Sequence, residues 1–336
     1  MSFKLNFKKS PKDTRDYTIK SKINLSSQNV DLSSFCTSIK NQKGIGSCTS
    51  HACIALLEFL FKKFKQSTLS DLFSEKFVYY VTRVNIENGK PNDDSGAYIR
   101  DTMKCLAKYG SALEKTFPYI KENQSECDFA ETPNEAVYEE GRKYQITKYV
   151  NISDSNPISC LNDLKNVLNA GYGFVGGFLC FENLFNGENG FIPEPKGEIV
   201  GGHAIMFVGY DDEKKVFKFK NSWGEEWGNK GFGYLPYSYI LNGLAFDFWT
   251  ILETENNDNI FGIIKPNNRD YEISRRMNEI LRLSETENLE NVINMIDTDV
   301  TNSNLYGRDI KMLKEFVNRI YRLRQQFESV FEKIKS

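Results

Sequence analysis

Two residue types that can carry out nucleophilic chemistry stand out in this chain, a cysteine and a histidine. Cys48 ends the glycine-rich segment QKGIGSC, and His203 lies in the segment GGHA more than a hundred residues later. The 336 residues include only one other histidine, His51. Because a thiol nucleophile needs a neighbouring base, these two histidines are the only imidazole candidates for that role.

Helical geometry favours His203 over His51 as the partner of Cys48. Residues 48–65 are apolar at first and amphipathic later, which predicts a long helix that begins at Cys48. A side chain three residues into that helix points back along the helix rather than across a cleft. We therefore expect His51 to be a buried or edge histidine, and His203 to reach Cys48 from another part of the fold.

The other parts of an acyl-transfer site are also present. A helix N-terminus and an imidazolium both lower the pKa of a thiol, so the start of the predicted helix suits Cys48. Asn221, in the segment NSWG, can orient the ring of His203, and Gln42 can donate an amide hydrogen to a developing oxyanion. These four residues are the candidate catalytic residues, and the chemistry that they predict passes through an acyl-enzyme intermediate.

The elements that must position these residues change in character along the chain. Helices are expected at 96–109 and 157–170, each followed by a glycine. From residue 172 onward, short β-branched and aromatic runs separated by turns predict strands. Residues 1–30 have no periodicity and predict an extended arm, and a polar run after Glu253 predicts a linker.

The composition excludes several classes of protein. Hydrophobic residues make up 40% and charged residues 26%, as in ordinary globular proteins, and 43 Lys and Arg balance 45 Asp and Glu. No run approaches the roughly 18 apolar residues of a spanning helix, and the first residues lack the apolar core of a signal peptide. We expect no membrane association, no nucleic-acid partner, and a location in the cytoplasm or another reducing compartment.

The cysteines predict neither disulfides nor a metal site. Seven cysteines form an odd set without a CxxC pair, which is typical of reduced thiols. The nearest approach to a ligand cluster, Cys48, His51 and Cys53, would lie on different faces of one helix. No metal and no cofactor are therefore expected.

The last part of the chain predicts a helical extension with an open role. Apolar residues recur at spacings of three and four between 310 and 334, interrupted by Arg324, and helices at about 271–283 and 287–296 could pack against them. One interpretation is a helical hairpin that docks on its own catalytic domain. The other is a protein partner or self-association through residues 271–336.

The segments around the four candidate residues resemble the papain and cathepsin family of cysteine peptidases. The likeness rests on Gln42, on GSC ending at Cys48, on GHA around His203 and on NSWG from Asn221, and it extends from about residue 31 to 253. It implies an α+β fold with a helical L domain and an antiparallel, β-barrel-like R domain, followed here by the helical extension. It also implies a peptide or protein substrate and endopeptidase activity.

The resemblance implies substrate-binding roles for four further residues. Gly96 falls where a family glycine pairs with the substrate backbone, Gly202 precedes the catalytic histidine, and Trp223 shields the Asn–His contact. Asp247 falls where the family closes its S2 pocket, so an acid there implies acceptance of Arg or Lys at P2. A purely structural role for Asp247, in capping a turn, is the alternative.

The sequence also departs from the family pattern. Thr49 replaces the tryptophan that usually follows the nucleophile, and Ile45 stands where secreted members carry a disulfide cysteine. Because only about 30 irregular residues precede the catalytic part, we expect no long helical propeptide of the usual kind. The predicted organisation is an arm at 1–30, a catalytic domain at 31–254 and an extension at 255–336. We hypothesise that the arm lies over the cleft and makes the protein a zymogen.

Two other functions are weighed against a peptidase. One is a catalytically quiet papain-like binding module that acts through its C-terminal helices, and the other is an acyl-transfer enzyme of the transglutaminase type, whose third residue is usually Asp. The intact set of four catalytic positions favours the peptidase. Abundant Asn, Lys and Ile are typical of an AT-rich genome, such as that of a low-GC microbe or of a large DNA virus such as a mimivirus; in a virus, the virion would be a further location.

Overall fold

The computed structural model describes most of the catalytic region and part of the C-terminal extension. The chain divides into two compact units, residues 1–12 with 16–265 and residues 13–15 with 266–336. The residues described are 3–11, 13, 15–21, 27–64, 72–122, 124–152, 156–252, 261–264, 280, 288–298, 311, 313–322 and 325.

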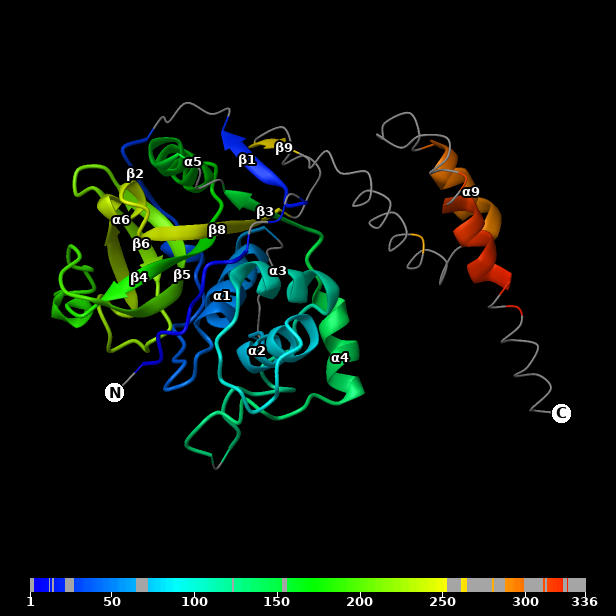
Figure 1. Ribbon diagram of the computed structural model, residues 1–336, viewed down its shortest axis with the longest axis horizontal. Helices are drawn as coiled ribbons and strands as arrows, with labels where there is room; N and C mark the ends of the chain where they lie inside the picture. The colour runs from blue at the N-terminus through cyan, green and yellow to red at the C-terminus, as the bar shows by residue number, and fades with distance from the viewer. Residues whose placement is uncertain are drawn as a thin grey trace. The chain divides into compact units, whose positions relative to one another are not determined.

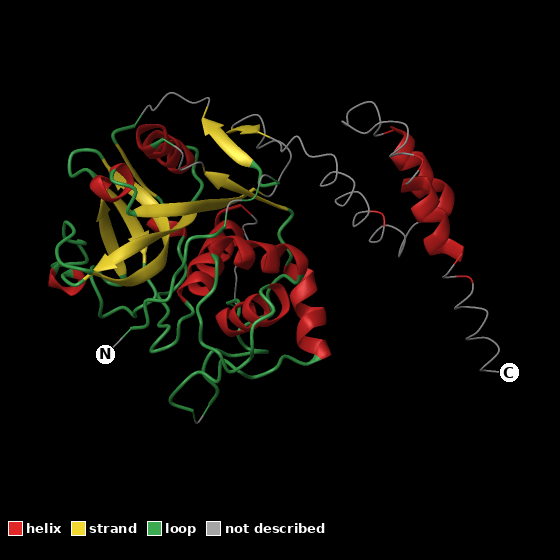
Figure 2. Ribbon diagram, in the orientation of Figure 1, coloured by secondary structure: helices red, strands yellow, loops and turns green. Residues whose placement is uncertain are grey.

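Four of the helices of the first unit, α1 to α4, gather in one lobe (Figures 1 and 2). Its central helix is α1 (Cys48–Phe64), whose first thirteen side chains are all buried, including the polar Thr49, Ser50, His51 and Glu58. Hydroxyl and amide caps start two of the shorter helices, because Ser74 accepts from the amide of Phe77 and Asn134 from that of Val137. Around α1 lie α2 (Glu75–Val81), α3 (Ile99–Lys108) and α4 (Glu135–Gly141), with short turns of helix at Ser33–Phe35, Thr82–Ile86 and Arg142–Tyr144.

The second lobe is built on a largely antiparallel sheet. In the described part of the chain the sheet has the order β7-β6-β5-β4-β8-β3-β1-β9, with β2 paired to β5. Among these strand pairs, only that of β1 and β3 is parallel. The strands are β1 (Thr18–Ser21), β2 (Asn29–Asp31), β3 (Lys148–Ile152), β4 (Phe174–Phe181), β5 (Ile199–Asp211), β6 (Val216–Lys220), β7 (Phe232–Pro236), β8 (Ala245–Leu252) and β9 (Phe261–Ile264), and α5 (Pro157–Asn169), α6 (Tyr237–Leu241) and a turn at Leu184–Asn186 complete the lobe.

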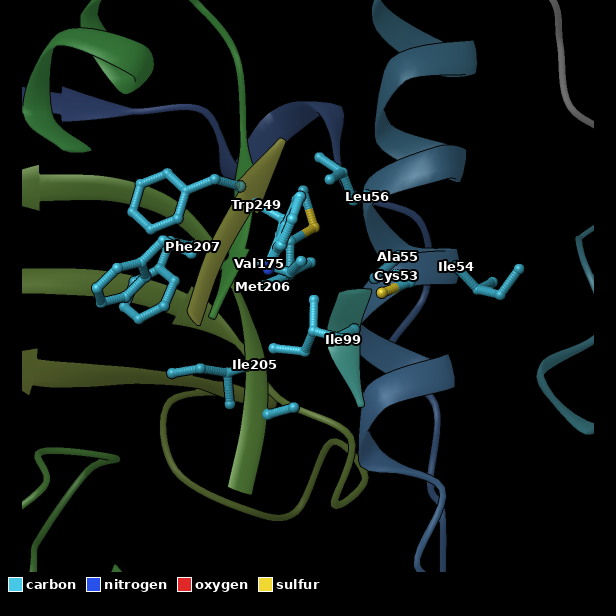
Figure 3. Close-up of a cluster of buried hydrophobic side chains, with 14 of the residues drawn as sticks. Cys53, Ile54, Ala55, Leu56, Ile99, Val175, Ile205, Met206, Phe207 and Trp249 are labelled. Atoms are coloured by element: carbon cyan, nitrogen blue, oxygen red, sulfur yellow. The ribbon is translucent and has the colours of Figure 1, made fainter. Parts of the chain in front are cut away.

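One hydrophobic core joins the two lobes. Cys53 and Leu56 of α1 are buried in the same cluster as Val175 of β4, Phe207 of β5 and Trp249 of β8. Figure 3 shows these side chains in the layer between the helix and the strands. Because the layer is close-packed, α1 and β5 are held in a fixed relation, and these two elements carry Cys48 and His203.

The structure refines several sequence-based expectations in this unit. Helix α3 begins at Ile99 rather than at Gly96, because Gly96 has a φ of +76° and Tyr98 is extended. The arm is not uniformly irregular, since residues 18–21 and 29–31 form strands. Residues 261–264, expected within the extension, pair with β1 and belong to the first unit.

The second unit is described in part. Helix α9 (Leu289–Thr298) coincides closely with the helix expected at 287–296, and residues 313–322 are helical. Ile280, Val292, Leu313 and Val317 form a small buried cluster. Apart from Ile280, the helix expected at 271–283 lies outside the described residues. None of the helices in the described ranges is long and apolar enough to span a bilayer.

Candidate active site

Cys48 lies at the junction of the two lobes. It is the first residue of α1 and its side chain is fully buried. The backbone N–H groups of Thr49 and of Ala204 face its sulfur. Ala204 follows His203 on β5, so the fold brings the two sequence-predicted residues together from opposite lobes.

His203 is oriented by Asn221. Its Nε2 donates to Oδ1 of Asn221 over 2.8 Å, and the backbone N–H of Ser222 donates to the same oxygen over 2.9 Å. The ring of Trp223 stacks on the imidazole at 4.4 Å between centroids. Nδ1 of His203 is buried and has no hydrogen-bond partner among the described residues. Since Nε2 carries the hydrogen, Nδ1 presents a lone pair that can accept a proton.

Gln42 is fixed behind the loop that leads to Cys48. Its Oε1 accepts from the hydroxyl of Ser222 over 2.7 Å, and its Nε2 donates to the carbonyl of Ile45 over 2.8 Å. An amide nitrogen has two hydrogens, so one remains for an oxyanion. A backbone hydrogen bond from Gln42 to Ser222 ties this loop to the segment that carries Asn221.

A buried network of charged and hydroxyl side chains supports the segment that carries Asn221. Glu58 of α1 accepts from Lys40 over 3.0 Å and from the hydroxyl of Thr37, which in turn accepts from Lys220 over 3.0 Å. Lys220 directly precedes Asn221. Because buried charges are tolerated only when they are paired, the network fixes the lobe that carries Asn221 against α1.

Burial favours the neutral form of both reacting groups in this structure. Burial raises the pKa of the Cys48 thiol to about 11, although the amides of Ala204 and Thr49 act in the opposite direction. Burial also lowers the pKa of His203 to about 4, opposed by the hydrogen bond to Asn221. At neutral pH these shifts give a thiol and an uncharged imidazole. We expect the thiolate–imidazolium pair to form only when water reaches the site.

The N-terminal residues lie across this site. The amide of Phe7 donates to the carbonyl of Gly202, and the amide of Gly202 donates to the carbonyl of Leu5, both over 3.1 Å. On the opposite wall, a Cβ on Gly96 would lie 2.6 Å from the carbonyl oxygen of Asn6. Two of the predicted substrate-binding glycines therefore contact the backbone of the chain's own residues 5–7.

Aromatic contacts fix the same segment at two points. Phe3 stacks on Trp223 at 4.8 Å between ring centroids. Phe7 is buried and stacks on Phe246 at 5.8 Å, over Gly177, where even a Cβ would lie 1.7 Å from its ring. The absence of a side chain at Gly177 thus creates the space that Phe7 fills.

Asp247 also contacts the arm. Its Oδ2 accepts from both the amide and the hydroxyl of Ser10, over 3.0 and 2.7 Å, and its Oδ1 accepts from the indole of Trp249 over 2.7 Å. Burial raises the pKa of this carboxyl, and its φ is +62°. With the arm in place, both carboxylate oxygens of Asp247 therefore accept hydrogen bonds.

The structure also identifies residues that sequence reasoning missed. Asp94 accepts from the amide of Gly46 over 3.0 Å and from Lys4 over 2.6 Å, and Phe7 and Ser10 fill sites in the cleft. The one sequence signal for Asp94 is an acidic residue two positions before Gly96. His51, by contrast, is buried, and its Nδ1 lies 3.0 Å from the carbonyl oxygen of Ser47.

All seven cysteines are free and buried. Within the described ranges, no three or more His, Cys, Asp and Glu side chains are grouped so as to hold a metal ion.

Comparisons with known proteins agree with this geometry. The model of the family described as papain family cysteine protease matches residues 26–240. A peptidase C1-like protein of Acanthamoeba polyphaga mimivirus is 33% identical over 237 residues, which are 68% of this chain and 73% of that protein.

Solved structures give the same result. Xylellain, a cysteine protease from Xylella fastidiosa, is 33% identical, with a TM-score of 0.63 over 75% of this chain and 96% of that one. The proform of the ragweed pollen allergen Amb a 11 is 22% identical, with a TM-score of 0.56 over 70% of this chain and 69% of its own, and shows a likeness of fold alone.

Proposed function

Because the chain belongs to the papain family of cysteine proteases, we propose that it is an endopeptidase in which Cys48 is the nucleophile and His203 the acid and base. One observation carries this assignment. The hydrogen bond from Nε2 of His203 to Asn221 leaves Nδ1 as a buried proton acceptor, on the residue next to Ala204, whose amide faces the sulfur of Cys48.

The reaction follows from these positions. The thiolate of Cys48 adds to the substrate carbonyl, and the oxyanion accepts hydrogen bonds from the amide of Cys48 and from Nε2 of Gln42. His203 protonates the leaving amine as the C–N bond breaks, which gives an acyl-enzyme. Water, deprotonated by His203, then hydrolyses the thioester and releases the thiol of Cys48.

The arm supports a second part of the proposal, that the protein is latent as folded here. Residues 5–7 occupy hydrogen-bonding groups of Gly202, and Phe3 covers Trp223. A substrate backbone needs these same groups, so it must displace the arm. Latency by residues 3–10 also accounts for the neutral state of the two reacting groups, since the arm excludes water from them.

The third part of the proposal is a preference for a basic residue at position P2 of the substrate. When the arm leaves, Oδ2 of Asp247 loses both hydrogen bonds from Ser10, and the indole of Trp249 remains bonded to the carboxyl. A buried carboxylate with free acceptor capacity favours a cationic partner. Phe246 beside it offers an apolar surface to the stem of an Arg or Lys side chain.

Active-site labelling tests the central assignment. The full chain, carrying Phe7→Ala so that the arm does not cover the site, is treated with an epoxysuccinyl inhibitor under reducing conditions, and the adduct is located by mass spectrometry. We expect one adduct, on Cys48. The variant Cys48→Ala should lose the adduct and peptide hydrolysis, by a factor of ~10⁴ or more, as expected when a nucleophile is removed.

Cys53→Ala is the matched control, because Cys53 is another buried free thiol on the same helix, five residues after Cys48. It should keep both the adduct and the hydrolysis. Hydrolysis by Cys48→Ala at the wild-type rate, or labelling at another cysteine, would overturn the assignment.

A further inference from the structure

Asp94 is a largely buried acid on the wall of the cleft that the catalytic steps above do not use. Its side chain is 9% exposed. Oδ1 accepts from the hydroxyl of Tyr79 over 2.5 Å and from the amide of Gly46 over 3.0 Å. The same tyrosine oxygen accepts from the amide of Gly96 over 3.2 Å. Tyr79 thus fixes both the carboxylate and the glycine that lies opposite the arm.

The carboxylate lies close in space to the segment that leads to the nucleophile. Gly46 precedes Cys48 by two residues, and a Cβ on Gly46 would meet Oδ1 of Asp94 at 3.1 Å and Nδ2 of Asn6 at 3.0 Å. Nδ2 of Asn6 also donates to the carbonyl of Asp94 over 2.9 Å. The side of the cleft next to Gly46 is therefore polar and acidic, and side chains of the arm fill it.

The charge of Asp94 is balanced by the arm. Lys4 donates to Oδ2 over 2.6 Å, and it is the one cation that bonds to this carboxylate among the residues the structure describes. The side chain of Lys4 is 45% exposed, so the ion pair lies at an open rim. If the arm withdraws, a largely buried acid beside the nucleophile loses this cation.

The course of the arm shows on which side of the scissile bond this acid lies. The amine that leaves must be protonated by His203, whose ring stacks on Trp223, so the leaving group lies toward Trp223. Phe3 covers Trp223, whereas Asn6 lies beside Gly46 and Gly96, and Ser10 reaches Asp247. Asp94 is therefore on the acyl side, next to the reacting carbonyl.

We propose that Asp94 is a specificity-determining residue that binds the cationic side chain of Arg or Lys at P1, in the place that Lys4 holds in the covered state. The inference rests on the proposed peptidase function and adds a second acidic subsite to the one at Asp247. A cation bound at Asp94 also cancels a negative charge beside the thiolate. Burial is the larger cause of the raised pKa of the Cys48 thiol, and the negative charge of Asp94 raises this pKa to a smaller extent.

A pair of isosteric probes tests the proposal on the full chain. Two peptide substrates and two matching acyloxymethyl ketones differ only at P1, with Arg in one and citrulline, its neutral isostere, in the other. Because a charge-assisted hydrogen bond is about twice as strong as a neutral one, we expect about tenfold higher kcat/KM for Arg. The ketones should show the same ratio in their rates of Cys48 labelling.

The variant Asp94→Asn removes the charge and keeps an oxygen that accepts from Gly46 and Tyr79. We expect it to lower kcat/KM for the Arg substrate about tenfold and to leave the citrulline substrate nearly unchanged. Asp93→Asn is the matched control, since the same charge is removed from an exposed neighbour, and it should keep the ratio. All chains are also made with Phe7→Ala, which weakens the arm, so that turnover is measurable.

The outcomes separate this inference from the proposed function. Equal rates for Arg and citrulline, with Cys48 labelled by both ketones, would overturn the role of Asp94 and leave the peptidase intact. An equal loss for both substrates in Asp94→Asn would assign Asp94 to support of the Gly46 loop instead. No Cys48 adduct in any chain, including Phe7→Ala, would overturn both.

Discussion

At the scale of single residues, the sequence is most informative where chemistry allows one residue type only. A thiol nucleophile and an imidazole base each come from one residue type, so Cys48 and His203 could be predicted from residue type, and Asn221 from the resemblance of its NSWG segment. Asp94 could not, because its partners Gly46 and Lys4 lie 48 and 90 positions away and many surface acids resemble it. Its role depends on a fold that places those atoms together.

Asp247 is the residue for which the sequence left two interpretations, a structural role and a role in specificity. In the covered state it is structural, since it binds Ser10 and Trp249. Its φ of +62° is tolerated best by Asn, Asp and Gly. A replacement by Ala would therefore strain the backbone and remove the charge at the same time, whereas Asn removes the charge alone.

We predict that Asp247→Asn lowers the preference for Arg over Phe at P2 by about tenfold, because the substrate cation loses a charged hydrogen-bond partner. The measurement is the ratio of kcat/KM values for two peptides that differ only at P2, in chains that also carry Phe7→Ala. Cleavage of the Phe peptide serves as the internal control and should change little. An unchanged ratio would leave Asp247 with its structural role only.

At the scale of elements, local pattern predicts helices and strands but not which distant strands pair. The amphipathic run from Cys48 predicts α1, and the aromatic runs after residue 172 predict the sheet. Strand β1 lies between β3 and β9, and β9 pairs with it over four residues, from Thr18 opposite Ile264 to Ser21 opposite Phe261. Such short segments, more than 200 residues apart, carry no periodicity that would reveal the pairing.

The pairing of β1 with β9 predicts an asymmetric effect of two truncations. Ending the chain after Lys265 keeps β9, whereas ending it after Leu252 removes β9 and exposes the edge of β1. Each backbone hydrogen bond contributes a net ~1 kcal/mol, so the shorter chain should lose about 2 kcal/mol or more of unfolding free energy. For a unit of this size, that lowers Tm by about 4–8 °C.

Thermal unfolding of the two truncated chains measures this difference, with the chain ending after Lys265 as the control for loss of the helical extension. Equal Tm values for the two truncated chains would show that β9 contributes nothing to the first unit. A large fall already in the longer chain would assign the stabilisation to the extension instead.

At the scale of the whole catalytic unit, one segment closes the cleft between two rigid lobes. Residues 3–10 pass from Trp223, which we propose to be on the leaving-group side, to Asp247, which we propose to be on the acyl side. A substrate must run the other way, with its amine half toward Trp223, so we expect the arm to resist cleavage by its own site. Two features anchor the C-terminal end of the arm. Nε of Arg100 donates to the carboxylate of Asp16 over 2.7 Å, and β1 follows, in which Ile19 is fully buried.

Because β1 anchors the arm, the choice of variant matters for an experiment that displaces the arm from the cleft. Deletion of residues 1–30 would remove β1 and expose the core around Ile19, so a loss of activity there would be ambiguous. A change confined to the cleft is cleaner. Phe7 is the best position, because its buried ring fills the space over Gly177, while its neighbour Lys8 is exposed.

We predict that Phe7→Ala releases the arm and raises the rate of Cys48 alkylation by iodoacetamide about 100-fold at pH 7. Truncating a buried Phe side chain destabilises a folded state by about 3–5 kcal/mol. Here only the state in which the arm covers the cleft is destabilised, because Phe7 is buried in that state alone. In the wild-type chain, with the pKa of Cys48 near 11, the rate should rise about tenfold per pH unit from pH 7 to 9. In Phe7→Ala, hydration of the site should let the ion pair form and flatten this profile.

Lys8→Ala is the matched control and should behave as the wild type, whereas equally fast, pH-independent alkylation of all three chains would show that the arm does not restrain the thiol.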